Sequence, residues 1–119
     1  MELFNERGIA LYIEEKALAK MLSCAHYYCS FEAGGIILGK KVVGFEKYII
    51  TDIGTPTRFD RQAPLSFVRN KKDAQILTNE AWRKSNGIIN RIGEWHSHVF
   101  PSPIPSTQDR YDMYRIYRD

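Results

Sequence analysis

Hydrophobic and polar positions follow two different periods along the chain, and the two periods predict two kinds of element. In some stretches apolar residues alternate with polar ones or form short unbroken runs, which is typical of strands; in others they recur every third or fourth position, which is typical of amphipathic helices. We predict strands over residues 9–13, 36–39, 48–53, 65–69 and 88–96, and helices over 14–29, 73–85 and from 106 onward.

Glycine and polar residues separate these elements. Gly34 and Gly35 interrupt the first helical pattern, the turn-like segment 43–47 predicts a hairpin, and Asn86-Gly87 is typical of a helix C-terminus. The predicted order is strand, helix, three strands, helix, strand, helix. This order favours an α/β or α+β domain in which helices flank a single mixed β-sheet.

Composition is consistent with one soluble domain over residues 1–119. With 44% hydrophobic and 26% charged residues, the chain has enough apolar surface to fold and is unlike a disordered protein. No apolar run approaches the length of a membrane span, and the acidic N-terminus lacks a secretory signal, so we expect a cytoplasmic protein with no membrane partner. The net charge of +3 is scattered along the chain and gives no support for nucleic-acid binding.

Cys24 and Cys29 are the two cysteines, and both are expected to be reduced thiols. Together with His26 they raise the possibility of a metal site near the end of the first helix. A structural zinc site needs four ligands, and no fourth residue stands at a recognised spacing. We therefore favour an ordinary helix surface for this segment.

A second group of polar residues follows the last predicted strand. His96 and His98 share a face if the backbone is extended, and a proline-containing loop leads from them to Asp109. Three protein ligands with one open position describe a catalytic zinc site. Each residue also has an ordinary explanation: Ser106 and Asp109 have the spacing of a helix capping box, and Glu32 can be a surface acid.

The joint pattern resembles a known signature. Glu32-x-x-Gly35-x-Ile37-x-Gly39, then His96-Ser97-His98, seven residues, and Ser106-x-x-Asp109 resemble the motif of the JAMM (MPN+) metalloproteases. The context around the histidines is most similar to the bacterial branch called Prok-JAB, which includes short proteins found with mobile elements and antiphage signalling operons. The resemblance implies a JAB/MPN-like fold with layering like that of cytidine deaminase.

The resemblance also implies an activity and a role for each residue. His96, His98 and Asp109 would bind Zn²⁺, Glu32 would be the general base, and Ser106 would donate a hydrogen bond to the oxyanion. The expected reaction is hydrolysis of the peptide or isopeptide bond after the C-terminus of a ubiquitin-like protein. E1- and E2-like conjugation proteins are the expected partners. Ser97 is expected to face away from the metal, because side chains alternate along a strand.

The sequence is also compatible with two other functions. Some members of the wider family keep the fold without metal and serve as binding modules, and others are related to DNA repair. The chain also ends at Asp119, whereas the family's domain usually continues with further strands. We expect either a truncated or minimal form that lacks C-terminal strands, or a sheet that a partner completes.

Overall fold

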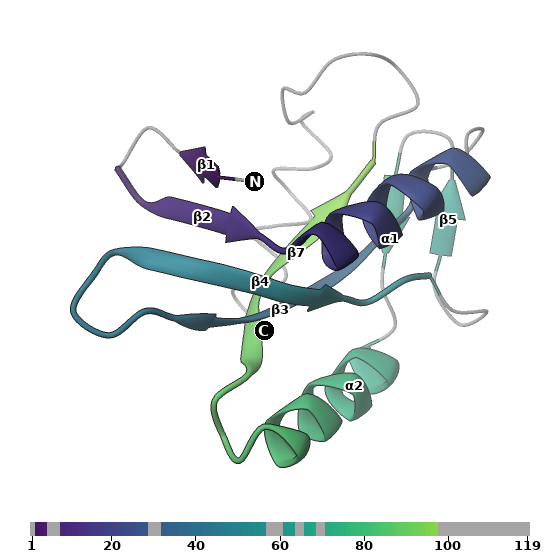
Figure 1. Ribbon diagram of the computed structural model, residues 1–119. Helices are drawn as coiled ribbons and strands as arrows, with labels where there is room; N and C mark the ends of the chain where they lie inside the picture. Colours follow the sequence, from purple (N-terminus) through teal and green to yellow (C-terminus); the bar gives the residue numbers. More distant parts are fainter. Residues whose placement is uncertain are drawn as a thin grey trace.

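A five-stranded mixed β-sheet forms the centre of the fold, with the strand order β1-β2-β4-β3-β7 (Figure 1). The structure is a computed structural model, and it describes residues 2–4, 8–28, 32–56, 61–63, 66–68 and 71–97. The strands of this sheet are β1 (Glu2–Phe4), β2 (Ala10–Ile13), β3 (Gly34–Lys41), β4 (Lys47–Ile53) and β7 (Asn90–His96).

The sheet combines one parallel pair with three antiparallel pairs. Strands β2 and β4 run parallel, whereas β1 with β2, β3 with β4, and β3 with β7 are antiparallel. The β3–β4 hairpin closes through a tight turn in which Gly44 has a φ of 83°, a backbone conformation that suits glycine. This confirms the hairpin predicted at residues 43–47 and places β3 next to both β4 and β7.

A separate two-stranded sheet contains β5 (Arg61–Ala63) and β6 (Ser66–Val68). The strand predicted over residues 65–69 corresponds to β6. The apolar pattern predicts no element between residues 53 and 65, and this was wrong at β5. Its three residues form a strand through backbone pairing with β6, which their polar side chains do not reveal.

The two helices cover opposite faces of the sheet (Figure 1). Helix α1 (Glu15–Tyr27) packs on one face, where its buried residues meet the aliphatic side chains of β2 and β4. Helix α2 (Lys71–Lys84) packs on the other face against β3. The first core contains Ile13, Ala17, Cys24, Ala33, Ile50, Ile53 and Trp95, and the second contains Ile36, Leu38 and Ala74. The predicted mixed sheet flanked by helices is confirmed.

Helix α2 ends where the sequence predicted. Asn86 and Gly87 have φ values of 56° and 83°, and the Gly87 N–H donates a 2.8 Å hydrogen bond to the Trp82 carbonyl. A left-handed residue after the last turn satisfies helix carbonyls that would otherwise lack donors. The chain then turns back onto the sheet and begins β7.

Cys24 belongs to the core rather than to a metal site. Its side chain is buried against β2 and β4, it is a free thiol, and burial raises its pKa. A neutral buried thiol behaves as a small apolar group. The helix surface expected for this segment is wrong at Cys24, which is buried, and Cys29 lies outside the described residues.

Lys20 and Asp52 form an ion pair that joins α1 to β4, with 3.0 Å between Nζ and Oδ1. Burial opposes ionisation of Asp52, but hydrogen bonds from Lys20 and the Ile53 N–H, and the charges of Lys20 and Lys16, hold its pKa below the usual range of an aspartate. The ionised carboxylate is therefore favoured in the folded state. Its contribution is present above the unfolded pKa and is lost as the pH falls through the folded pKa.

We expect Asp52→Asn to lower the free energy of unfolding by only about 0.5 kcal/mol at neutral pH, because both side chains are more than a third exposed and water screens the pair. Urea unfolding of both proteins should show the difference at pH 7 and a smaller difference in acid, as the pH falls through the lowered pKa of Asp52. An undiminished difference in acid would show that the carboxylate charge is not its cause.

Across the part of the chain that the structure describes, neither helix combines the length and apolar character that crossing a bilayer requires.

Candidate functional site

The beginning of β3 and the end of β7 bring two of the candidate residues to the same end of the sheet. Gly34 lies directly opposite His96 in the antiparallel register. One residue further, Ala33 and Ser97 are joined by hydrogen bonds although they are 64 positions apart in the sequence. Glu32 directly precedes this pair on one segment and His96 belongs to the other, so the tertiary fold makes them neighbours.

Glu32 and His96 also share a face of the sheet. Trp95 packs in the core under α1, so the alternation of side chains along β7 directs His96 to the face covered by α2. On the opposing segment, Ala33 packs in the α1 core and Ile36 in the α2 core. The same alternation therefore directs Glu32 toward the α2 face. The register therefore places the predicted base and the first predicted metal ligand at the same end of the sheet and on the same face.

The side chains of Glu32 and His96 differ in their exposure to solvent. Among the residues that the structure describes, Glu32 is charged and buried, with 4% of its surface exposed. His96, in contrast, is exposed at the end of its strand. Burying a carboxylate costs free energy unless other groups pair with it, and buried ionisable groups are frequent at functional sites. A shielded carboxylate beside an accessible imidazole can exchange protons with a substrate while the imidazole binds a metal.

Close backbone packing fixes this end of the sheet. Gly35 lies against the backbone of Gly54, and a Cβ added at Gly35 would overlap the Gly54 oxygen and come within 2.7 Å of its carbonyl carbon. The Trp95 indole N–H donates a buried 2.8 Å hydrogen bond to the same oxygen, and the Gly54 N–H donates to the Ile36 carbonyl. These contacts join β3, β7 and the segment that follows β4.

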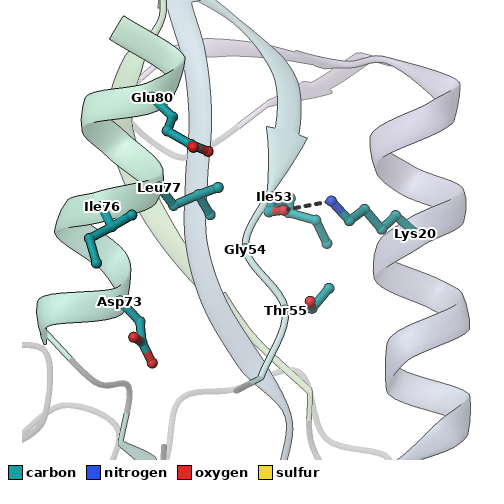
Figure 2. Close-up of a pocket in the computed structure, with 8 residues that line it drawn as sticks. All are labelled: Lys20, Ile53, Gly54, Thr55, Asp73, Ile76, Leu77 and Glu80. Carbon is teal, nitrogen blue, oxygen red and sulfur yellow. Dashed lines mark hydrogen bonds between the residues drawn. The ribbon is translucent and has the colours of Figure 1, made fainter. Parts of the chain in front are cut away.

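A pocket of about 330 Å³ adjoins this end of the sheet (Figure 2). Residues of α2 form one wall, the segment that leaves β4 forms the floor, and Lys20 of α1 lies opposite with its Nζ bound to the Ile53 carbonyl at 3.1 Å. Because Gly54 lines the pocket and also packs on Gly35, the pocket is close to the segment that carries Glu32. The lining residues are Lys20, Ile53, Gly54, Thr55, Asp73, Ile76, Leu77 and Glu80.

The other predicted site residues, His98, Ser106 and Asp109, lie outside the described residues. Within residues 8–28, 32–56 and 71–97, no three histidine, cysteine or acidic side chains gather closely enough to bind a metal. The described segments supply one imidazole of the predicted set and the buried acid beside it. Two imidazoles and a carboxylate are a common zinc ligand class, so the donor chemistry fits Zn²⁺.

Comparison with known proteins identifies the family. The model described as "Prokaryotic homologs of the JAB domain" matches residues 14–117. The chain belongs to the prokaryotic JAB family. The match spans all of the candidate residues, from Glu32 to Asp109, and confirms the family indicated by the sequence motif.

Three curated proteins that are similar to this chain are each named CD-NTase/cGAS isopeptidase. The Pseudomonas aeruginosa protein is 33% identical over 71% of this chain and 52% of its own length. The Escherichia coli protein is 32% identical over 70% of this chain and 52% of its own length. The Vibrio cholerae protein is 30% identical over 93% of this chain and 70% of its own length. The chain thus spans about half the length of the first two relatives.

A solved structure supports the fold independently. The solution structure of a protein from Desulfitobacterium hafniense superposes with a TM-score of 0.71, covering 87% of this chain and 67% of the other. The two sequences are only 20% identical, so this similarity concerns the fold alone.

The sequence did not reveal the residues that support the site. The indole N–H of Trp95 donates to the Gly54 carbonyl, and the hydroxyl of Ser97 accepts from the Ala33 N–H, so each side chain binds backbone from a distant segment. A tryptophan next to the first histidine and a serine between two histidines are visible in the sequence. Their partners are not, because pairing between β3, β4 and β7 decides them.

Proposed function

We propose that this JAB-family chain is a zinc-dependent isopeptidase. Its substrate would be a conjugate in which the C-terminal carboxylate of one protein is joined through an amide to an amine of another. The names of the curated relatives favour a conjugate that contains a CD-NTase or cGAS-like protein, which we take as the acyl donor, and the JAMM resemblance offers a ubiquitin-like protein as the alternative.

One observation carries the proposal. Glu32, which is 4% exposed, lies at the same end and on the same face of the sheet as His96, because Gly34 pairs with His96. Burial of a carboxylate costs free energy, and hydrolysis of an amide needs a group that moves protons next to the metal, which is the role proposed for Glu32. Because the chain belongs to the prokaryotic JAB family, amide hydrolysis is the reaction that we propose for these residues.

In the proposed reaction, a water oxygen bonds to the amide carbonyl carbon and the bond from that carbon to the amine nitrogen breaks. The Glu32 carboxylate accepts a proton from the water and transfers it to the departing nitrogen, which leaves as a neutral amine. The residues that would hold Zn²⁺ are His96, His98 and Asp109, and Ser106 would donate a hydrogen bond to the carbonyl oxygen as negative charge develops there. The chemistry that Zn²⁺ supplies when bound is Lewis acidity, which polarises the carbonyl and makes water a better nucleophile at neutral pH.

The pocket beside Gly54 is the proposed entry for the acyl side of the substrate. It joins the segment packed on Gly35, and its walls combine apolar side chains of α2 with the charges of Lys20, Asp73 and Glu80 (Figure 2). Such a mixed lining can hold an extended tail that carries both apolar and charged side chains.

Metal content and cleavage test the proposal directly. We expect about one zinc per folded chain, since a catalytic site with three protein ligands binds a single ion. The first substrate is a bacterial CD-NTase whose C-terminus is linked to a lysine of a reporter protein, and the second carries a ubiquitin-like protein in its place. A chelator should abolish cleavage, and added Zn²⁺ should restore it.

The same experiment separates the enzyme from a binding module. A folded protein that retains the conjugate in a pull-down, contains no zinc and cleaves neither substrate would contradict the isopeptidase proposal. If the protein cleaves only the ubiquitin-like conjugate, the proposed reaction stands, and the substrate is a ubiquitin-like conjugate instead of a CD-NTase conjugate.

A further inference from the structure

Ser97 makes contacts that its position between two histidines does not reveal. Its N–H donates a 2.7 Å hydrogen bond to the Ala33 carbonyl, and its hydroxyl oxygen accepts a 3.0 Å hydrogen bond from the Ala33 N–H. The distance from the hydroxyl oxygen to the Ala33 carbonyl is 3.5 Å. The side chain of Ser97 thus binds the backbone of the opposite segment.

This arrangement replaces one bond of the β-ladder. In an antiparallel hydrogen-bonded pair, each residue normally donates its N–H to the carbonyl of the other. Here the hydroxyl of Ser97, rather than its carbonyl, accepts the bond from Ala33. Ala33 is fully buried, so its N–H needs a protein partner, and the hydroxyl supplies one at the point where β7 ends.

The bond controls the position of Glu32 through peptide geometry. The Ala33 nitrogen and the Glu32 Cα belong to the same planar peptide unit. A hydrogen bond to that nitrogen therefore fixes the plane from which the Glu32 side chain projects. Since Ser97 directly follows His96, the same bond sets the carboxylate relative to the imidazole.

We propose that Ser97 is a positioning residue, which holds the Glu32 carboxylate at its working distance from the metal-binding edge. This inference rests on the proposed function, because Glu32 is taken as the base of that reaction. Without the hydroxyl the peptide unit before Ala33 can rotate, and displacement of a catalytic group by about 1 Å can lower a rate by about 10²-fold.

The chain contains a matched control for this contact. At the end of α2, the hydroxyl oxygen of Ser85 accepts a 2.8 Å hydrogen bond from the Ile89 N–H and donates to the Ala81 carbonyl at 2.7 Å. Ser85→Ala and Ser97→Ala therefore remove the same kind of bond. Ser85 precedes β7 and Ser97 follows it, so the two serines lie at opposite ends of that strand.

The kinetic test uses the reporter conjugate that the wild type cleaves. We expect Ser97→Ala to lower kcat by about 10- to 100-fold with unchanged KM and zinc content, as misplacement of the base predicts. Ser97→Thr, which keeps the hydroxyl, should restore kcat, and Ser85→Ala should keep it. An unchanged kcat in Ser97→Ala, an equal loss in Ser85→Ala, or failure of threonine to restore kcat would each overturn the proposal.

Amide hydrogen exchange supplies a readout that does not depend on cleavage. The Ala33 amide should exchange slowly in the wild type and in Ser85→Ala, and much faster in Ser97→Ala. Slow exchange in Ser97→Ala would refute the proposed hold on Ala33, whereas absence of cleavage by the wild type would refute the proposed function instead. If Ser97→Ala does not fold, the near-isosteric pair Ser97→Thr and Ser97→Val gives the same comparison.

Discussion

Glu32→Gln is expected to lower kcat by about 10²–10⁴-fold, which is the usual contribution of a general acid-base group. Glutamine has nearly the shape of glutamate but cannot accept and return the proton. The protein should still fold, because the substitution removes a charge from a site that is 4% exposed. Zinc content should also stay the same, since Glu32 is proposed as the base and not as a ligand.

Glu94→Gln provides the control for this experiment. Glu94 lies opposite Ile36 in the register, two residues before His96, and alternation along β7 places both on the α2 face. It has no proposed part in the reaction, so its variant should cleave at the wild-type rate. Steady-state kinetics and metal analysis of the wild type, Glu32→Gln and Glu94→Gln test whether Glu32 is the base. Normal turnover by Glu32→Gln would show that another group is the base even if zinc is present.

Gly35→Ala is expected to lower the free energy of unfolding by about 3 kcal/mol, at the upper end of the usual cost of overpacking. The new methyl group would overlap the Gly54 oxygen and lie 2.7 Å from its carbonyl carbon. These are backbone atoms, and the same oxygen accepts the buried hydrogen bond from Trp95, so they cannot move aside easily. Thermal and urea unfolding should both reveal the loss.

Gly93→Ala is the matched control, because Gly93 also lies in the sheet, opposite Ile37. A Cβ there would meet only the tip of the Ile37 side chain at 3.7 Å, which is an ordinary contact. Alanine also reduces the freedom of the unfolded chain, so stability should be unchanged or should rise by up to about 1 kcal/mol. Equal losses in the two variants would show that the Gly35–Gly54 contact is not the cause.

Most elements of the fold could be predicted from local pattern. The helices and the strands of the β3–β4 hairpin and β7 follow from apolar periodicity, and the end of α2 follows from Asn86-Gly87, because these features depend on residues close in sequence. The strand β5 could not be predicted, since its three residues have no apolar pattern and form a strand only by pairing with β6. The parallel pairing of β2 with β4 was equally invisible, because it depends on how α1 crosses the sheet.

For the site, the sequence by itself determined the residue types and their spacing, which indicated the JAMM resemblance and a zinc-dependent hydrolysis with Glu32 as base. Only the tertiary structure placed Glu32 beside His96, buried the carboxylate, and joined Ser97 to Ala33 and Trp95 to Gly54. The physical reason is that side-chain chemistry and local periodicity depend only on residues that are close together in the sequence. Register and burial instead arise when segments far apart in the chain pack together, here β3 and the segment after β4 against the end of β7.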